Sequence, residues 1–400
     1  MRRSNAPTLQ DVASQAGVTA MTVSVVLNGA KSATRVSEAT RLRIQEAAAR
    51  LHYRPNAVAR GLSRRRMDTI GIVSSIINSD EEGDLNLYFL EILNGILESA
   101  AKHGQNTTIF SITDWATDES KILQFCDGRV DGMIFIAPQR LSPSFAEALQ
   151  HHTPFVTMHA NDLLPRTYNL DIDNEGGAYA AVQYLIAQGH RRIAHFPGQL
   201  KFLGARQRFD GYRRALEEAQ IPFDASLILE GNYNTASGKN RALRMLTEGP
   251  INPLPTAIFC ASDDIAAGCL EVLTNHGIRV PEDISLVGYD DVLTARMTTP
   301  PLTTVKQPFR RLGSRAVEML MPQILNGIVP TVGATRTVEN SASSNDSITT
   351  DIAVTAEETK MASGSDVPHT EVFDVKLVIR GSVGTPTPQP LPPLRQDLAT

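Results

Sequence analysis

Strand-like and helix-like patterns alternate along residues 69–289, and this alternation restricts the fold more than any other feature of the sequence. The runs 69–74, 106–112 and 131–137 have the length and the branched apolar residues of buried strands. An amphipathic helical pattern over residues 88–103 follows the first run. Because parallel strands need a crossover between them, usually a helix, the alternation predicts parallel sheets with helices on both faces.

The same repeat continues to residue 289, and its length bears on how many sheets to expect. Further strands are expected at 154–158, 192–196, 256–261 and 285–289, and further helices at 175–189, 209–220, 236–247 and 264–276. A chain of 400 residues is too long for one ordinary domain, so two such sheets are favoured over one. Ligands of open parallel sheets bind beyond the carboxyl ends of the strands, so a crevice at those ends is the expected ligand site.

The charge of the chain is divided between a basic beginning and an acidic remainder. Residues 1–67 contain 12 Arg and Lys against 3 Asp and Glu, whereas residues 68–400 contain 26 against 40. A basic head on an acidic body indicates that the head binds nucleic acid. A basic disordered tail is the alternative, but the head has clear helical periodicity.

The head carries the start and stop signals of three short helices. Thr8 and Asp11 form a capping box, apolar residues follow at helical spacing, and Gly17 ends this first helix. Thr19 caps a second helix, and Ser37 caps a third. Two short helices separated by a glycine turn are the helix-turn-helix arrangement, which holds its second helix in the major groove of DNA.

The stretch 53–67 links the head to the body. Pro55 gives it a stiff entry, and Asn56 is a good N-cap for a helix over residues 57–62. A helix of under two turns is marginal in water, and Gly61 weakens it further. The linker is therefore expected to be helical only when something else supports it.

Several motifs extend this interpretation to a family. The head contains Thr8-x-x-Asp-Val-Ala-x-x-Ala-Gly-Val-Thr-x-x-Thr-Val-Ser-x-Val-Leu-Asn28, and the linker contains Tyr53-Arg-Pro-Asn-x-x-Ala-Arg60. Both closely resemble lactose-repressor-type (LacI/GalR) transcriptional regulators. The body resembles the effector-binding core of the same family, in the motifs Gly189-His-Arg-Arg-Ile-Ala, Val280-Pro-Glu-Asp-Ile-Ser-Leu-Val-Gly-Tyr-Asp-Asp291 and Pro300-Pro-Leu-Thr-Thr-Val-x-Gln-Pro308.

The resemblance implies an all-α helix-turn-helix head and an α/β core similar to periplasmic sugar-binding proteins. Such a core has two doubly wound subdomains around a cleft, and we place the three crossings between them near residues 170, 300 and 333. The predicted units are the head at 1–52, the linker at 53–67, an N-terminal effector subdomain at 68–170 and 301–333, and a C-terminal effector subdomain at 171–300 and 371–384.

The last part of the chain departs from the family pattern. Residues 334–370 form a low-complexity insertion rich in Ser, Thr, Asp and Glu, and residues 371–382 resemble the last strand of the core. Residues 385–400 form a proline-rich tail without a leucine heptad. The helical tetramer bundle of some relatives is therefore not expected, and a homodimer is.

By the resemblance, Ala20, Met21 and Val25 face the base edges of the operator. None of them can form the bidentate hydrogen bonds that read guanine or adenine, which leaves apolar contact with thymine methyl groups. The remaining head residues are expected to contact phosphate or backbone and to set position without specifying sequence, namely Thr8, Thr19, Thr22, Ser24 and Asn28. For Thr8 and Thr19, helix capping explains the residue equally well.

In the linker, the resemblance places Asn56, Ala59 and Leu62 at the minor groove of DNA. Leu62 matches a leucine that is inserted between base steps, a wedge that kinks the duplex at a cost of a few kcal/mol. The alternative is that Leu62 is an apolar core residue of an ordinary helix. The three arginines at 64–66 and Pro55 favour the wedge.

The cleft residues implied by the resemblance are Tyr88, Phe89, His159, Arg208, Tyr233, Ser262 and Asp290. Asp290 would accept hydrogen bonds from a diol, Arg208 would donate several in a fixed fork, and Tyr233 would cover the ligand face. Aromatic walls with a carboxylate and an arginine suit a sugar, whose ring has an apolar face and a rim of hydroxyl groups. Ser262 and His159 stand where asparagine and aspartate are common, so no particular sugar is implied.

Each cleft residue also has an ordinary structural explanation. The Asp290 and Asp291 carboxylates have the chemistry to cap the segment that follows them. Tyr88 and Phe89 have the chemistry to pack in a core at the start of a helix. Arg208 has potential partners in Asp210 and Glu217 on a solvated face. The cleft interpretation is preferred because the family motifs recur in order.

The sequence thus predicts a DNA-binding transcriptional regulator, and specifically a repressor, that senses a small carbohydrate. Its expected partners are near-palindromic operator DNA, the effector and a second copy of the chain. No cofactor, metal or catalytic residue is expected, since the sequence has no phosphate-binding loop, no dinucleotide fingerprint and no metal motif. His151 and His152 have no third ligand at useful spacing.

Two other classes of protein remain to be weighed. A solute-binding protein for transport would not need the basic head and would carry a signal peptide, which the sequence does not show. A sugar-modifying or nucleotide-dependent enzyme would need one of the motifs above. Cys126, Cys260 and Cys269 form no C-x-x-C pair, and no run of eighteen apolar residues exists, so a cytoplasmic protein with reduced thiols is expected.

Overall fold

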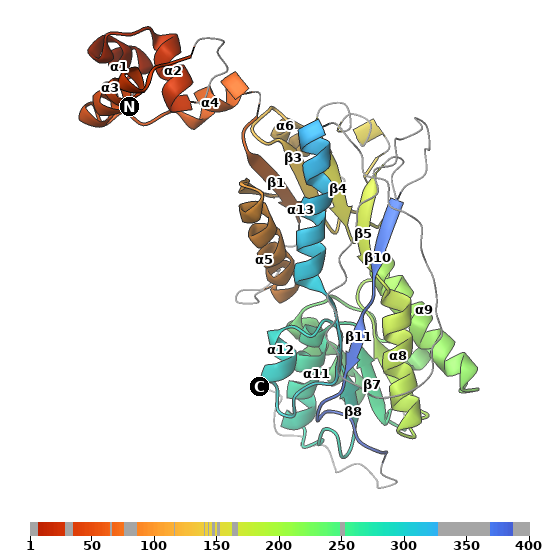
Figure 1. Ribbon diagram of the computed structural model, residues 1–400. Helices are drawn as coiled ribbons and strands as arrows, with labels where there is room; N and C mark the ends of the chain where they lie inside the picture. The colour runs from red at the N-terminus through yellow and green to blue at the C-terminus, as the bar shows by residue number, and fades with distance from the viewer. Residues whose placement is uncertain are drawn as a thin grey trace, which may run out of the picture.

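The computed structural model describes residues 7–28, 35–64, 66–75, 86–115, 117–139, 141–142, 144–145, 149, 153–161, 167–248, 253–326 and 369–386. These residues form a small helical head, a linker helix and an elongated α/β core with two subdomains (Figure 1). The predicted fold class is confirmed. Residues 76–85, the insertion up to residue 368 and the tail from residue 387 lie outside the described residues.

The head is a three-helix unit built by the predicted local signals. It consists of α1 (Leu9–Ala16), α2 (Ala20–Asn28) and α3 (Glu38–Arg50). Thr8 and Asp11 form the capping box, and Gly17 ends α1 with a left-handed φ of 65° that glycine adopts without strain. The small core contains Val12, Ala13, Val23, Ile44 and Ala47.

The linker helix α4 (Ala57–Arg64) lies between the head and the core. Its N-terminal turn is capped as predicted, because the Asn56 side-chain oxygen accepts a hydrogen bond from the Ala59 amide at 3.4 Å. The helix continues two residues beyond the predicted end, to Arg64.

The N-terminal subdomain contains a parallel sheet with the strand order β10-β5-β4-β3-β1-β2. The helices α5 (Leu87–Lys102) and α13 (Phe309–Asn326) run side by side over this sheet (Figure 1), and α6 (Glu119–Phe125) belongs to the same subdomain. The strands are β1 (Thr69–Ser74), β2 (Asn106–Ser111), β3 (Gly132–Ile136), β4 (Phe155–Met158), β5 (Tyr168–Ile172) and β10 (His369–Phe373).

The C-terminal subdomain contains a smaller parallel sheet with the order β6-β7-β8. Its strands are β6 (Ile193–Phe196), β7 (Ala257–Cys260) and β8 (Ser285–Val287). Its helices are α8 (Asn174–Ala187), α9 (Leu203–Glu218), α10 (Thr235–Thr247), α11 (Asp263–Asn275) and α12 (Leu293–Met297), with the short 3₁₀ helix η1 (Ala225–Leu227). Each predicted strand and helix of the core is present, although α9 begins six residues early. The sequence did not predict β5 or the helices α6, α12 and α13.

Three segments connect the subdomains. The first passes through Asp173 between β5 and α8, and the other two contain β9 (Thr304–Lys306) and β11 (Lys376–Val378), which pair antiparallel. Because β10 pairs with β5 in the N-terminal sheet, the third crossing comes after Phe373. The prediction of a crossing near residue 333 is therefore wrong, and residues 371–373 belong to the N-terminal sheet and not to the C-terminal subdomain. The later part of the predicted segment does contact the C-terminal sheet, where the Leu286 amide donates to the Ser382 carbonyl. No glycine or proline marks the break between β10 and β11, so the two strands read as one run in the sequence.

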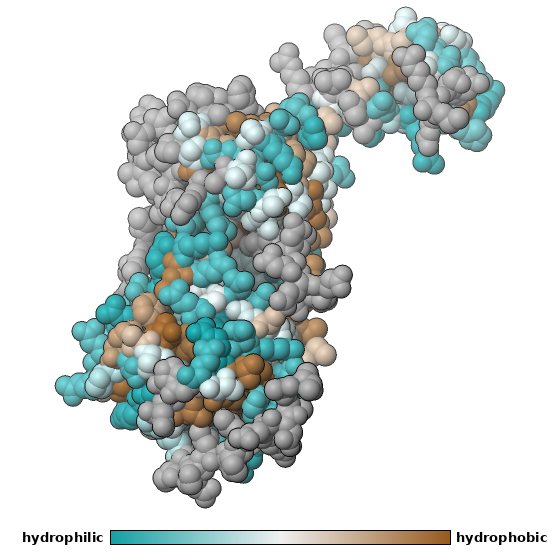
Figure 2. All heavy atoms as spheres, turned by 180° about the vertical axis from the view of Figure 1, so that it is seen from behind, coloured by the Kyte–Doolittle hydropathy of each residue, from teal (hydrophilic) through white to brown (hydrophobic). Residues whose placement is uncertain are grey.

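Seen from behind, hydrophilic residues cover much of the described surface of the head and both subdomains, with apolar residues in smaller patches among them (Figure 2). Among the described residues, no helix is long and apolar enough to span a membrane.

Candidate DNA-binding head and effector cleft

The second helix of the head presents the residues that the sequence assigns to base contacts. Val23 of α2 is fully buried against α1 and α3, which turns the opposite side of the helix outward. Met21 is 65% exposed, and Ala20 and Val25 are half-buried. The outward side of α2 is therefore apolar where it would meet the base edges.

The predicted phosphate contacts divide into exposed and buried residues. Thr8 and Thr19 are exposed and cap α1 and α2, so the capping explanation holds for both, and the Thr19 hydroxyl also lies 2.9 Å from that of Thr22. Asn28 is only 5% exposed, and its amide donates to the Ser24 hydroxyl at 3.3 Å. The Asn28 side chain is therefore mostly buried, and its contact with DNA stays a prediction.

The linker helix carries the three remaining DNA candidates. Ala59 is exposed, and Asn56 caps the helix. Leu62 lies in α4, but its side chain is outside the described residues, so its insertion into the minor groove stays a prediction.

The cleft between the subdomains contains a cavity of about 340 Å³. His159 follows β4, Ser262 follows β7 and Asp290 follows β8, so the cavity lies at the carboxyl ends of strands, as expected for parallel sheets. His159 and Asp290 have left-handed φ values of 51° and 121°, a conformation that costs free energy in residues other than glycine and is often found at functional sites. Six of the seven predicted cleft residues line the cavity: Tyr88, His159, Arg208, Tyr233, Ser262 and Asp290.

Phe89 does not line the cavity. Neighbouring residues of a helix point about 100° apart, so Tyr88 and Phe89 cannot both face the cleft. Tyr88 takes the cavity side of α5, whereas Phe89 is 5% exposed and packs in the large hydrophobic core. For Phe89 the ordinary explanation, a core residue, is therefore the right one.

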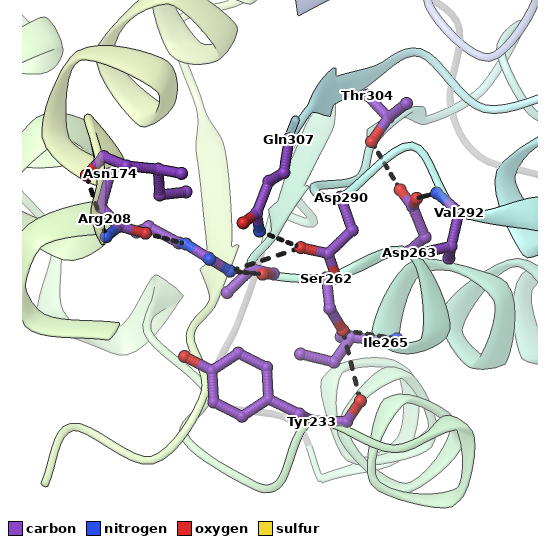
Figure 3. Close-up of polar contacts among 12 residues, drawn as sticks. Asn174, Arg208, Tyr233, Ser262, Asp263, Ile265, Asp290, Val292, Thr304 and Gln307 are labelled. Atoms are coloured by element: carbon purple, nitrogen blue, oxygen red, sulfur yellow. Dashed lines mark hydrogen bonds and ion pairs between the residues drawn. The ribbon is translucent and has the colours of Figure 1, made fainter. Parts of the chain in front are cut away.

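Arg208 is the central cation of the cleft. Its Nε donates to the Asn174 side-chain oxygen at 2.9 Å, and its Nη1 donates to the Ala261 carbonyl and lies 3.9 Å from Asp290 Oδ1. The guanidinium also lies 3.8 Å from the centre of the Tyr289 ring. Figure 3 shows Arg208 extended between Asn174 and Asp290. The alternative partners Asp210 and Glu217 take no part in these contacts.

Asp290 is held beside Arg208 by a hydrogen bond from Gln307, whose Nε2 lies 2.6 Å from Oδ1. Burial raises the pKa of Asp290 to about 7, although the neighbouring Arg208 opposes this rise. A second buried carboxylate, Asp263, accepts hydrogen bonds from the Val292 amide and the Thr304 hydroxyl, which fixes the segment after Asp290 (Figure 3). Burial raises the pKa of Asp263 well above its usual value.

Tyr233 is placed by backbone contacts. The Ser262 hydroxyl donates to the Tyr233 carbonyl at 3.3 Å and also accepts from the Ile265 amide at 3.2 Å, so Ser262 joins the Tyr233 loop to the start of α11. The Tyr233 ring lies against Gly198, where a Cβ atom would overlap the ring. Phe202 meets the same ring edge-on at 6.3 Å. Tyr233 and Phe202 together form the aromatic part of this side of the cavity.

Arg241 holds the loop that carries Tyr233. Its side chain is 1% exposed, and its Nη2 donates to the Asn232 carbonyl at 2.7 Å. The other donors reach the carbonyls of Pro197, Leu229 and Ser237. A buried arginine satisfied by four carbonyls fixes the backbone of residues 229–237, although it does not touch the cavity itself.

The N-terminal side of the cleft has fewer hydrogen bonds. The Tyr88 ring lies 5.6 Å from the His159 ring and meets Phe309 edge-on at 5.3 Å. His159 Nδ1 lies 3.1 Å from Asp171 Oδ1, and its Nε2 is buried without a hydrogen-bond partner among the residues that the structure describes. Burial, with the charges of Asp171 and Asp290, raises the pKa of Tyr88 well above its usual value, so the phenol is neutral.

Comparison with known proteins decides the class. A sequence profile described as "Bacterial regulatory proteins, lacI family" matches residues 8–56, and one described as "Periplasmic binding protein-like domain" matches residues 182–339. The HTH-type transcriptional repressor PurR of Vibrio atlanticus is 37% identical over 324 residues, which cover 79% of this chain and 92% of that protein. The PurR of Vibrio parahaemolyticus is 34% identical over 321 residues, with the same coverage. The chain belongs to the LacI family.

Solved structures of the LacI family agree with this placement. The Lac repressor dimer bound to operator and the anti-inducer ONPF is 28% identical, covers 95% of this chain and all of its own length, and has a TM-score of 0.73. The CelR–cellobiose complex, also 28% identical, covers 94% of this chain and 99% of its own, with a TM-score of 0.63. The LacI-family chain is therefore a DNA-binding transcriptional repressor and not an enzyme, which excludes a transport protein without a DNA role.

The LacI-family cleft also contains residues that the sequence did not identify. Two of them had a visible signal, because Asn86 and Asn234 are N-caps of α5 and α10. The others carry no local signal and become neighbours only through the fold. The additional polar lining residues are Asn86, Asn161, Asp171, Asn174, Gln199, Asn232, Asn234 and Asp264.

Asn161 lines the cavity and connects the two subdomains. It follows β4 in the N-terminal subdomain, and its amide group contacts the segment before α9 in the C-terminal subdomain. Its Nδ2 donates to the Lys201 carbonyl at 3.0 Å, and its Oδ1 accepts from the Leu203 amide at 2.5 Å. One side chain thus joins the two subdomains at the point where Phe202 covers the cavity.

The LacI-family chain shows no metal site within the part that the structure describes, where no group of three or more His, Cys, Asp and Glu side chains is placed to hold an ion. His151 and His152 lie outside that part. Cys126, Cys260 and Cys269 are free thiols, and the latter two are buried.

Proposed function

We propose that this repressor is a homodimer whose affinity for a near-palindromic operator is controlled by a neutral sugar bound between the two subdomains. The observation that carries the proposal is that the Arg208–Asp290 pair lines the same cavity as the aromatic side chains of Tyr88, Tyr233 and Phe202. Vicinal hydroxyl groups both donate and accept hydrogen bonds, which suits a guanidinium beside a carboxylate. The apolar face of a sugar ring suits the aromatic groups.

The charges around the cavity favour a neutral effector over a phosphorylated one. Arg208 lies beside Asp290, whereas Asp171 and Asp264 add further carboxylates to the lining. Among the described lining residues, an anionic ligand would meet carboxylates and no cation besides the paired Arg208, in a site of low dielectric constant. The likeness to a cellobiose complex of CelR supports a carbohydrate, at 28% identity.

On the DNA side, two heads of a dimer bind two half-sites related by the same twofold axis. Met21, Ala20 and Val25 of α2 contact thymine methyl groups, and Leu62 of each linker helix enters the minor groove near the centre of the operator. The protein acts in the cytoplasm, where the chromosome is accessible to it.

Effector binding changes DNA affinity through the angle between the subdomains. Closure or reorientation of the cleft moves β1, and with it the linker that enters the core at Met67. The separation of the two linkers in the dimer then changes. Because such coupling is reciprocal, operator DNA alters sugar affinity by the same factor as sugar alters operator affinity.

The experiment begins with selection of an operator by the purified protein from a random-sequence DNA library. Binding of this operator is then measured with a panel of neutral mono- and disaccharides, their phosphate esters and nucleobases. We expect a neutral sugar to change operator affinity, and phosphate esters to have no effect. A response to a nucleobase or to a sugar phosphate alone would overturn the sugar assignment, and failure to select any operator would overturn the operator-binding part of the proposal.

A further inference from the structure

The linker helix is too short to be stable alone, so the contacts that support it have a direct bearing on operator binding. Arg64, the last residue of α4, reaches back to the head. Its Nε and Nη2 both donate to the Asn28 backbone carbonyl, at 3.0 and 2.7 Å. These two residues are 36 positions apart in the sequence.

The acceptor of these hydrogen bonds is the end of the recognition helix. Asn28 is the last residue of α2, so its carbonyl has no partner within the helix and lies at the negative end of the helix dipole. Asn28 is 5% exposed, which limits its access to water. The Arg64 guanidinium, with its two parallel donors and its positive charge, is therefore well suited to this carbonyl. The contact joins the end of α4 to the end of α2.

The other end of the linker is fixed to the core. The Asp131 carboxylate accepts hydrogen bonds from the Met67 amide at 2.8 Å and the Thr69 amide at 3.3 Å. The Arg66 amide donates to the Gly61 carbonyl at 3.0 Å, and the Met67 sulfur occupies the space beside Gly61. Contacts thus run from β3 of the core through the linker helix to α2 of the head.

We propose that Arg64 is a positioning residue for operator binding. Its guanidinium docks the linker helix on the end of the recognition helix, so that both helices meet the DNA as one unit. Arg64 acts through the protein and not through a phosphate contact. The inference rests on the DNA-binding role of the head and does not depend on the identity of the effector.

The first test separates positioning from charge. Operator affinity is measured for the full-length wild type, Arg64→Lys and Arg64→Met between low and moderate salt, on the duplex that the wild type selects. Lysine keeps the charge but lacks the fork, so we expect both variants to lose roughly tenfold in affinity, the value of a hydrogen bond to a charged group. The slope of log affinity against log salt should stay at the wild-type value for both.

The salt slope also defines the result that would overturn the proposal. A lost phosphate contact would reduce the slope by about 0.9 in Arg64→Met and spare the affinity of Arg64→Lys. Arg60→Met, which removes the same charge from the same helix, serves as the matched comparison. If Arg64→Lys binds as the wild type does, Arg64 is a phosphate contact and the proposal fails.

A second test needs neither operator nor effector. Hydrogen exchange of the backbone amides of residues 60–64 is followed in the free protein. Loss of the Asn28 contact should speed this exchange in Arg64→Met and Arg64→Lys but not in Arg60→Met. Equal exchange in the wild type and both Arg64 variants would show that the contact does not support the helix. Because no sugar is present, a failed sugar assignment leaves this result unaffected.

Discussion

The two sides of the effector cleft are built differently. On the C-terminal side, Arg208, Tyr233 and Asp290 are fixed by buried hydrogen bonds and by a supporting arginine behind them. On the N-terminal side, the side chains of Tyr88 and His159 are placed by ring packing and by the contact of His159 with Asp171. We call these sides the polar wall (Asn174, Arg208, Tyr233, Ser262 and Asp290) and the aromatic wall (Tyr88 and His159).

The difference suggests a division of roles between the walls. Polar groups that recognise a ligand gain most when they are already oriented, since binding then costs little ordering. Rings that contact a ligand by their faces are less demanding in direction, and they can approach after the ligand has bound. The polar wall is therefore expected to select the effector, and the aromatic wall to close over it.

The largest effect is expected from Arg241→Met, which removes the support of the polar wall. Methionine keeps much of the buried stem but leaves four carbonyls without their donor. We expect a loss of about 3 kcal/mol in the free energy of unfolding, which corresponds to roughly 10 °C in the thermal midpoint. Arg244→Met is the control on the same helix, because Arg244 is half-exposed and forms only a surface pair with Glu248. A midpoint for Arg241→Met equal to that of the control would contradict the supporting role.

Arg208→Met tests recognition by the polar wall directly. The change removes the donors to a ligand and leaves Asp290 buried without its cation. Titration calorimetry with the sugar found in the panel should show a loss of affinity of about a hundredfold. Operator binding without sugar should remain near the wild-type value. Arg214→Met on the same helix, where Arg214 pairs with Glu175 on the surface, should bind sugar normally. A loss below about threefold would move recognition away from this wall.

The pH dependence of stability reports the burial of Asp290. Its pKa is raised from 3.8 to about 7 in the folded protein, so the folded state holds a proton that the unfolded state has released between these values. Stability supplied by that proton is present below about pH 4 and is lost as the pH rises through about 7. Asparagine cannot titrate. The free energy of unfolding of the wild type, relative to that of Asp290→Asn, should therefore fall by roughly 1 kcal/mol per pH unit between about pH 4 and about pH 7. Urea titrations at several pH values measure the difference, and a flat difference would mean that Asp290 is ionised throughout.

These residues also show how far the sequence was informative. The head was predictable because its signals are local: a cap such as Ser37 and the residue it bonds are three positions apart. The third crossing was not, because β10 and β11 lack a break signal between them. Of the cleft residues, six followed from motif order, but the choice between Tyr88 and Phe89 depends on the rotation of α5 against the core.

The supporting contacts were beyond prediction for a different reason. Arg241 bonds the carbonyl of Pro197 across 44 residues, and Arg64 bonds that of Asn28 across 36. Every residue has a backbone carbonyl, so the sequence does not show which carbonyls an arginine side chain will bond. An arginine that donates to buried carbonyls therefore cannot be told from a surface arginine by sequence. Only the fold distinguishes the two cases.

The smallest effect is expected where the two walls meet, at Asn161→Ala. The Asn161 side chain joins the aromatic-wall subdomain to the Lys201 carbonyl and the Leu203 amide, and so holds Phe202 over the cavity. Each neutral hydrogen bond contributes about 1 kcal/mol at most after solvent competition, and the cleft can still close without them. We therefore expect sugar affinity to fall by about fivefold, mainly through faster dissociation.

Asn106→Ala is the control, since Asn106 also bonds a carbonyl, that of Asp68, but at the opposite end of the same sheet. Tighter sugar binding by Asn161→Ala than by the wild type would contradict this expectation. The two hydrogen bonds would then keep the cleft closed in the free protein, and the aromatic wall would have to move away before the sugar could reach the polar wall.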